Sequence, residues 1–168
     1  MNCLSLEQYL HSMISFYYRS YTMDINEELL ERKNIDSPDM VGVINLTQHE
    51  LTPEQKAFID IECHTDRQKV KELLTFTKLP TQFQILRRAV GLADIVRNIV
   101  DQDEHINLFL VLIGGAPYLM KPLIEELKET GVTPVFSYTD RVSVETIQPD
   151  GSVVKTQVFK HLGYVEAF

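Results

Sequence analysis

Cysteine is scarce in this sequence, which carries only Cys3 and Cys63 among its 168 residues. Two cysteines are too few for a disulfide framework, so the composition favours a reducing, cytoplasmic location. No apolar run is long enough to cross a bilayer, and we therefore expect no membrane partner. The N-terminus lacks a basic region and carries polar side chains at Glu7 and Ser12, so it does not predict a signal peptide.

Basic residues are also fewer than acidic residues. The chain has 16 Lys and Arg residues against 24 Asp and Glu residues, a formal net charge of −8. A general DNA or RNA binder needs a basic face from which counterions are released, so this balance argues against a long nucleic acid as partner. A small phosphate-bearing ligand stays open, because a few local donors outweigh a modest overall repulsion.

What is present is typical of a globular protein, with 44% hydrophobic and 24% charged residues. The pattern predicts a helical extension and linker over residues 1–39 and a main domain over residues 40–168. Apolar residues recur at helical spacing within Leu6–Lys33, and Asn34–Asp39 forms a turn-rich linker. The helix of this extension either packs on the domain or forms a dimer contact.

The first half of the main domain alternates one strand with helices. Thr52 and Gln55 form a capping box with Pro53 at the first helical position, and Thr81 and Gln84 repeat that pattern. The predicted elements are a strand at Met40–Leu46, a helix from Thr52, a helix near Asp66–Leu74 and a long helix from Thr81 to about Asp101.

The second half contains the strongest strand signal, the unbroken apolar run Ile106–Ile113, which is typical of a central strand covered on both faces. A glycine-rich turn then leads into a helix that Gly131 ends, followed by a strand at Val132–Tyr138. Arg141–Gln148 and Ser152–Lys160 alternate around a Pro-Asp-Gly turn and predict a hairpin. We therefore predict an α/β fold: a Rossmann-like parallel sheet with flanking helices, a C-terminal β-hairpin and an N-terminal helical extension.

Ligands of open α/β sheets collect beyond the carboxyl ends of the parallel strands. Three segments occupy such positions here: Thr47-Gln48-His49-Glu50, Gly114-Gly115-Ala116-Pro117 and Thr139-Asp140-Arg141. Because these ends share one edge of a parallel sheet, we expect the three segments to meet there and form a cradle for a phosphate.

Gly114 and Gly115 carry the most information, because a backbone without Cβ atoms approaches a ligand closely and helix-start amides favour phosphate. Pro117 has no N–H, so the amides of Gly115 and Ala116 would serve. The other interpretation is a tight strand-to-helix turn without a ligand. The motif is neither a Walker sequence nor a dinucleotide fingerprint.

His49 follows a strand end and is a candidate acid/base or ligand donor, the alternative being a loop histidine bonded to backbone. Arg141, Lys155, Lys160 and His161 form a candidate basic cluster facing the strand ends, the alternative being a solvated hairpin face. No metal site is predicted, since Cys63-His64 and the remaining histidines follow no ligand spacing. Neither Ser137 nor Ser143 has a His/Asp pattern that indicates a serine triad.

Three stretches of the sequence resemble a group of small proteins from CRISPR loci and mobile elements. They are residues 45–55 (NLTQHELTPEQ), residues 114–120 (GGAPYLM), and residues 141–145 (RVSVE) with Gly151 and residues 158–161 (VFKH). Order and spacing agree from about Met40 to the C-terminus. Members of the group include ring nucleases with a CARF-like (CRISPR-associated Rossmann fold) domain. This chain differs in having 39 residues before the matching start.

The resemblance implies a cytoplasmic homodimer that acts in antiviral defence by binding cyclic oligoadenylate across its two-fold axis. It further implies cleavage by attack of the ribose 2′-OH on the adjacent phosphodiester, without a metal or cofactor. The expected catalytic residues are His49, Arg141, Lys160 and His161. The expected ligand-binding residues are Thr47, Gln48, Gly114, Gly115, Ala116, Thr139 and Ser143. The alternative hypothesis is a non-catalytic module that binds a nucleotide signal or a partner protein.

Overall fold

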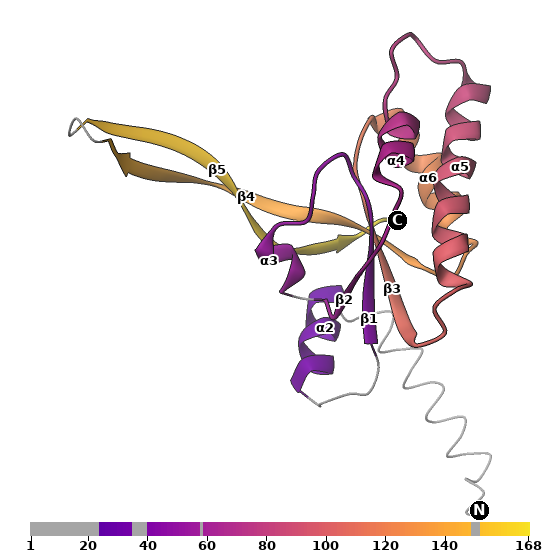
Figure 1. Cartoon of the computed structure of the whole chain (residues 1–168), viewed down its shortest axis with the longest axis horizontal. Coiled ribbons are helices and arrows are strands. Elements are labelled where there is room, and N and C mark those ends of the chain that lie inside the picture. Colours follow the sequence, from indigo (N-terminus) through magenta and orange to yellow (C-terminus); the bar gives the residue numbers. More distant parts are fainter. Residues whose placement is uncertain (1–23, 35–39, 58, 149–151) are drawn as a thin grey trace, which may run out of the picture.

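The computed structural model describes residues 24–34, 40–57, 59–148 and 152–168 (Figure 1). Its elements in chain order are α2 (Ile25–Asn34), β1 (Met40–Leu46), α3 (Pro53–Lys56), β2 (Ile61–Cys63), α4 (Arg67–Leu74), α5 (Gln82–Val100), β3 (Ile106–Ile113), α6 (Pro117–Lys128), β4 (Thr133–Ile147) and β5 (Val153–Glu166). None of the helices within these ranges has the length and apolar character needed to span a membrane.

The strands form one five-stranded sheet in the order β2-β1-β3-β4-β5. β1 pairs in parallel with β2 and with β3, and β3 pairs in parallel with β4, whereas β4 and β5 are antiparallel. β3 is thus the middle strand. Its side chains enter two different apolar clusters, Val111 and Ile113 on one face and Leu110 and Leu112 on the other. The mixed α/β class and the central position of Ile106–Ile113 are confirmed.

Helices cover both faces of this sheet, as Figure 1 shows. α4, α5 and α6 pack on one face, where their buried residues share a cluster with Val111. The predicted capping boxes at Thr52 and Thr81 are both present, with side-chain oxygens accepting from the backbone of Gln55 and Gln84. Asp66 caps α4 in the same way. Local sequence thus sets where these helices begin.

The opposite face is covered by α2, whose Ile25 and Leu29 are buried. The Asn26 side chain contacts β5: its Nδ2 donates to the Tyr164 carbonyl at 2.7 Å, and its Oδ1 accepts from the Tyr164 N–H at 2.7 Å. The rest of the predicted helix before residue 24, and linker residues 35–39, lie outside the described residues. The division of the chain at residue 39 stays a prediction.

The expected bounds of the last two strands need correction. The strand predicted at Val132–Tyr138 does not end there, because β4 continues through Thr139-Asp140-Arg141 into the hairpin. That segment has no glycine or proline to stop a strand, and a register shift between Tyr138 and Thr139 accommodates the change in course. β5 runs on to Glu166, past the predicted end at Lys160. The helix after Thr52 has only four residues, and the short β2 was missed.

The outer part of the hairpin projects from the body of the molecule (Figure 1). We call it the arm and define it as residues 140–147 of β4 and 153–160 of β5. The two segments pair in continuous antiparallel register, from Asp140 opposite Lys160 to Ile147 opposite Val153. All arm side chains are exposed except that of Val142, which is partly buried. The arm therefore contributes to the sheet ladder but not to the core.

Candidate functional site

A pocket of about 460 Å³ opens at the carboxyl ends of β1 and β3, beside β4. The strand order reverses here, because the chain moves from β1 to β2 on one side and β3 lies on the other. This is the position at which open α/β sheets bind ligands. The residues that line this strand-end pocket are Thr47, Gln48, His49, Glu50, Thr52, Gln55, Leu112, Ile113, Gly114, Gly115, Phe136 and Ser137.

The first wall of the strand-end pocket is the loop after β1, and hydrogen bonds from the Asn45 side chain hold this loop in place. Asn45 is only 2% exposed. Its Oδ1 accepts from the N–H of Thr47 at 2.9 Å and from the Thr47 hydroxyl at 2.8 Å. Its Nδ2 donates to the His49 carbonyl at 2.8 Å. One buried amide side chain thus fixes both the start and the turn of the loop.

Arg67, the first residue of α4, holds the same loop from the other side. Its guanidinium donates to the carbonyls of Asn45 at 2.8 Å, Thr47 at 2.9 Å and His49 at 3.0 Å. Its Nε lies 3.4 Å from a carboxylate oxygen of Glu50. Because the planar guanidinium presents several donors in fixed directions, it orders three carbonyls at once. The His49 side chain therefore extends from a loop with a fixed backbone.

The second wall is the Gly114-Gly115 turn between β3 and α6. Gly115 has φ +145°, a conformation that side-chain-bearing residues rarely adopt. Ala116 precedes α6 without a side-chain cap, and Pro117 occupies the first turn. In the described part of the chain we find no backbone hydrogen bond donated by Gly115 or Ala116. Their amides are thus available for an anionic group, as the sequence predicts.

The third wall is Ser137 on β4, which joins a chain of hydrogen bonds. Ser137 Oγ lies 2.8 Å from His161 Nδ1, and Gln55 Nε2 donates to the same Oγ at 3.1 Å. His161 is buried at 6% exposure and its ring stacks at a tilt on Tyr164, with centroids 4.7 Å apart. The Tyr164 hydroxyl donates to the Gln55 carbonyl at 2.9 Å. The sequence pattern indicated no histidine partner for Ser137, and the structure supplies one.

Burial lowers the pKa of His161 from its ordinary 6.5, because the charged imidazolium loses solvation; the Glu54 carboxylate acts in the opposite direction. A neutral imidazole is therefore the favoured form at pH 7, and it accepts a hydrogen bond at one ring nitrogen. The Ser137 hydroxyl therefore lies beside an imidazole that can act as a base.

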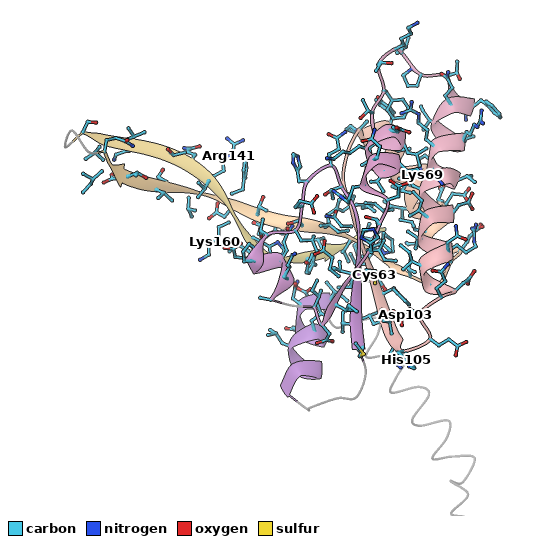
Figure 2. All side chains as sticks on the ribbon, in the orientation of Figure 1. Cys63, Lys69, Asp103, His105, Arg141 and Lys160 are labelled. Atoms are coloured by element: carbon cyan, nitrogen blue, oxygen red, sulfur yellow. The ribbon has the colours of Figure 1, made fainter. Side chains whose placement is uncertain are left out.

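The predicted cations lie elsewhere. Figure 2 shows Arg141 on the arm and Lys160 close to where the arm joins the body. The Arg141 guanidinium lies over the Phe159 ring, 5.2 Å from its centroid, and Lys155 pairs with Glu145 at 2.8 Å. Among the described residues that line the strand-end pocket there is no lysine or arginine. Arg141, Lys155 and Lys160 of the predicted basic cluster therefore do not line the strand-end pocket of their own chain, whereas His161 contacts Ser137, which does.

The other predicted site residues fall into two groups, those at the strand-end pocket and those away from it. Thr47, Gln48, His49, Gly114 and Gly115 meet at the strand-end pocket, and Ala116 follows directly in the chain. Thr139 lies within β4 and Ser143 lies on the arm, so neither lines this pocket. Within the described residues, no three His, Cys, Asp or Glu side chains are grouped as metal ligands.

Sequence reasoning missed four residues that build the site: Asn45, Gln55, Arg67 and Ser137. Gln55 was identified as part of a capping box, but a helix-start motif does not reveal that its amide also reaches β4. Arg67 and Asn45 are separated by two elements, and no local pattern connects them. The only available signal was a polar residue, Asn45, near the end of an apolar strand.

Comparison with known proteins gives one match. A family model described as "Uncharacterized protein MJ1673 family" covers residues 42–165, a span that includes every wall of the strand-end pocket. Neither the curated proteins nor the solved structures contain a match to this chain. Because the match extends over well more than half of the sequence, the chain belongs to the Uncharacterized protein MJ1673 family.

Proposed function

We propose that this protein binds a cyclic oligoadenylate at the strand-end pocket and opens the ring by metal-independent attack of a ribose 2′-OH on the neighbouring phosphodiester. The observation that carries the proposal is the convergence of three separate segments, residues 47–50, 114–115 and Ser137, on one pocket. The proposal treats the body as a Rossmann-like domain in which the switch between β1 and β3 receives the ligand.

The reaction suits such a pocket because the substrate contains its own nucleophile. The protein has to hold the 2′-oxygen, the phosphorus and the leaving oxygen near a line, and such positioning is worth about 7–11 kcal/mol. In this proposal the amides of Gly115 and Ala116 bind the phosphate oxygens and stabilise the charge that develops there. The fixed loop presents His49 to the leaving 5′-oxygen as a proton donor.

In this proposal the protein is a cytoplasmic homodimer that binds the cyclic oligoadenylate between its two protomers. Arg141 and Lys160 lie outside the strand-end pocket of their own chain. They would therefore reach the ring phosphates from the arm of the second protomer. Replacing either residue should weaken ring binding without changing the pocket itself.

The test is incubation of the purified protein with cyclic tri-, tetra- and hexa-adenylate in the presence of EDTA. We expect at least one ring to yield linear products that end in a 2′,3′-cyclic phosphate. His49→Gln should slow this cleavage. The control is His105→Gln, because His105 precedes β3 at the opposite edge of the sheet. Absence of turnover with all three rings would rule out the nuclease.

The second candidate is binding of a nucleotide signal without cleavage. The lack of lysine and arginine among the residues that line the strand-end pocket favours it, since cationic side chains commonly stabilise phosphoryl transition states. Calorimetric titration with the same rings decides between the two functions. Stoichiometric binding with the ring recovered intact would support the binding protein and contradict the nuclease.

A further inference from the structure

The hydrogen-bond chain from α3 to Ser137 on β4 has a fixed direction. The backbone N–H of Thr52 can only donate, and it donates to Gln55 Oε1 at 2.8 Å. The amide of Gln55 must therefore turn its Nε2 group toward Ser137, to which it donates at 3.1 Å. An NH₂ group cannot accept, so the Ser137 oxygen receives this bond on a lone pair.

Ser137 Oγ keeps its proton and a second lone pair, and its other neighbour is His161 Nδ1 at 2.8 Å, where the histidine tautomer decides which of the two donates. An imidazole that accepts at Nδ1 carries its proton on Nε2 when it is neutral. With His161 in this tautomer, the Ser137 hydroxyl donates to the histidine while its oxygen accepts from the capping box of α3. Ser137 itself lines the strand-end pocket, next to Gly114 and Gly115.

We propose that Ser137 and His161 form a proton relay that activates the attacking hydroxyl of a ligand in the strand-end pocket. This inference rests on the proposed ring-opening function and assigns the base that such a reaction needs. Ser137 is the residue that touches the substrate, and His161 accepts the proton through it. Gln55 is a positioning residue, because it acts only by orienting the Ser137 hydroxyl.

The ring-opening step involves two proton transfers along the relay and one exchange of bonds at phosphorus. The ribose 2′-OH gives its proton to Ser137 Oγ while Ser137 gives its own proton to His161 Nδ1. The 2′-oxygen forms a bond to phosphorus, and the bond from phosphorus to the 5′-oxygen breaks. The 5′-oxygen leaves with the electron pair and takes a proton from His49 or water. The products are a 2′,3′-cyclic phosphate, a 5′-hydroxyl and an imidazolium at His161, which returns its proton to solvent through Ser137.

Several charged and polar groups surround this imidazole. Glu54 on α3 supplies a negative charge that favours the imidazolium, Lys160 precedes His161 on β5, and the Tyr164 ring covers one side. A base with a pKa below the ordinary histidine value stays unprotonated to a lower pH. The relay is thus ready to accept a proton throughout the neutral range.

A spectroscopic test does not depend on turnover. In ¹⁵N-labelled wild-type protein at pH 7.5, we expect the His161 ring to show the tautomer protonated at Nε2. Gln55→Glu replaces the donor by a carboxylate, which still accepts from Thr52 but now attracts the Ser137 hydroxyl proton. The Nδ1 resonance of His161 should therefore shift, because the Ser137 hydroxyl no longer donates to it. A proton on Nδ1 in the wild type would overturn the relay.

The kinetic test uses the ring that the wild type opens. Ser137→Ala and His161→Phe should each lower kcat by about 100-fold or more while the Kd of the ring changes less than about threefold. Ser137→Thr keeps a hydroxyl and should restore most of kcat, which a purely structural role for Ser137 does not predict. Thermal unfolding of each variant reports whether it folds.

The outcomes separate the two proposals. Wild-type protein that opens no ring would reject the proposed function, and the catalytic role of Ser137 with it. Ring opening by Ser137→Ala at the wild-type rate, in a folded variant, would reject the relay alone. Equal loss in Ser137→Ala and Ser137→Thr would likewise overturn the relay, because the hydroxyl would not be the active feature.

Discussion

Gly114 and Gly115 are neighbours in the chain, yet the structure places different constraints on them. A Cβ atom on Gly114 would lie 3.6 Å from Thr47 Cγ2, which is ordinary van der Waals contact. Gly115 has φ +145°, so a side chain there strains the backbone whatever space is available. Gly114, without a side chain, leaves space between the loops after β1 and β3. Gly115 allows the turn between β3 and α6 to form.

Alanine substitutions at the two glycines should therefore have different effects, one on ligand binding and the other on stability. We expect the free energy of unfolding of Gly114→Ala to lie within about 1 kcal/mol of the wild-type value. This variant should bind the proposed ligand, cyclic oligoadenylate, more weakly, because its methyl group narrows the strand-end pocket. Gly115→Ala should lose about 1–3 kcal/mol of stability through backbone strain. Urea unfolding and ligand titration measure the two effects. Equal stability loss in both variants would contradict this assignment.

The buried His161 predicts how stability depends on pH. Burial lowers its folded-state pKa below the ordinary 6.5, so the unfolded chain binds the proton more readily. The stabilising effect of a neutral His161 is present above pH 6.5 and is lost as the pH falls from there through the lowered folded-state pKa. His161→Gln removes this component.

The measurement is urea unfolding of wild type and His161→Gln at pH 7.5 and pH 5.5. We expect the stability difference between the two proteins to shrink, or to reverse in favour of the variant, at the lower pH. Glu54 is coupled to His161, but its lowered pKa keeps it ionised at both pH values, and groups away from His161 cancel in the comparison. A difference that stays constant or grows toward pH 5.5 would show that His161 does not titrate in this way.

At the scale of elements, the loop after β1 depends on a residue of α4. Arg67→Met leaves the carbonyls of Asn45, Thr47 and His49 without their guanidinium donor, which should cost about 1–3 kcal/mol. Amide exchange in residues 47–50 should accelerate. The matched control is Arg97→Met, which removes an exposed ion pair with Asp94 and should cost less than about 1 kcal/mol. Similar losses in both variants would refute the role of Arg67 in ordering the loop.

The contact between α2 and β5 is equally specific. A Cβ atom on Gly163 would lie 2.7 Å from Asn26 Oδ1, so Gly163→Ala should displace α2 and expose Ile25 and Leu29. Asn26→Ala removes the obstructing atom, and in that background Gly163→Ala should cost less, with the backbone strain at φ +158° as the remaining cost. A double-mutant cycle with urea unfolding measures this coupling. Additive effects would mean that the two residues do not act through one contact.

At the scale of the whole molecule, the arm and the body differ in how they are stabilised. Directly opposed residues share a face of an antiparallel ribbon. One face of the arm therefore carries the β-branched side chains of Val142, Val144, Thr146, Val154, Thr156 and Val158, with Asp140 and Lys160 at its base. The other face combines polar and charged residues such as Ser143, Glu145 and Lys155 with the exposed apolar residues Ile147, Val153 and Phe159. An isolated two-stranded ribbon is only marginally stable in water.

We expect amide hydrogens of the arm to exchange much faster than those of β1 and β3, because its ladder has no core beneath it. Hydrogen–deuterium exchange with mass spectrometry at low protein concentration measures this. Slower exchange in the arm at high concentration would indicate that the arm becomes covered on self-association. Protection equal to that of β3 in dilute solution would contradict the prediction.

The sequence by itself determined the elements whose causes are local. The apolar run Ile106–Ile113 predicted the middle strand, and the capping residues Thr52 and Thr81 predicted where two helices begin, because a cap is satisfied by a backbone N–H only a few residues away. It also predicted that the residues after β1 and after β3 meet, since parallel strands end at one edge of a sheet. Thr47, His49, Gly114 and Gly115 do meet at the strand-end pocket.

Only the tertiary structure decided the rest. Gln55, Ser137 and His161 come from three elements and form a hydrogen-bond chain because the folded sheet aligns them, and no sequence spacing records that alignment. The sequence also could not show that β4 runs on into an arm that carries Arg141 away from the strand ends, since a strand and a polar loop without glycine or proline look alike. Helix caps and strand periods are short-range effects, whereas the partners of a buried polar side chain depend on which distant residues the fold brings within about 3 Å.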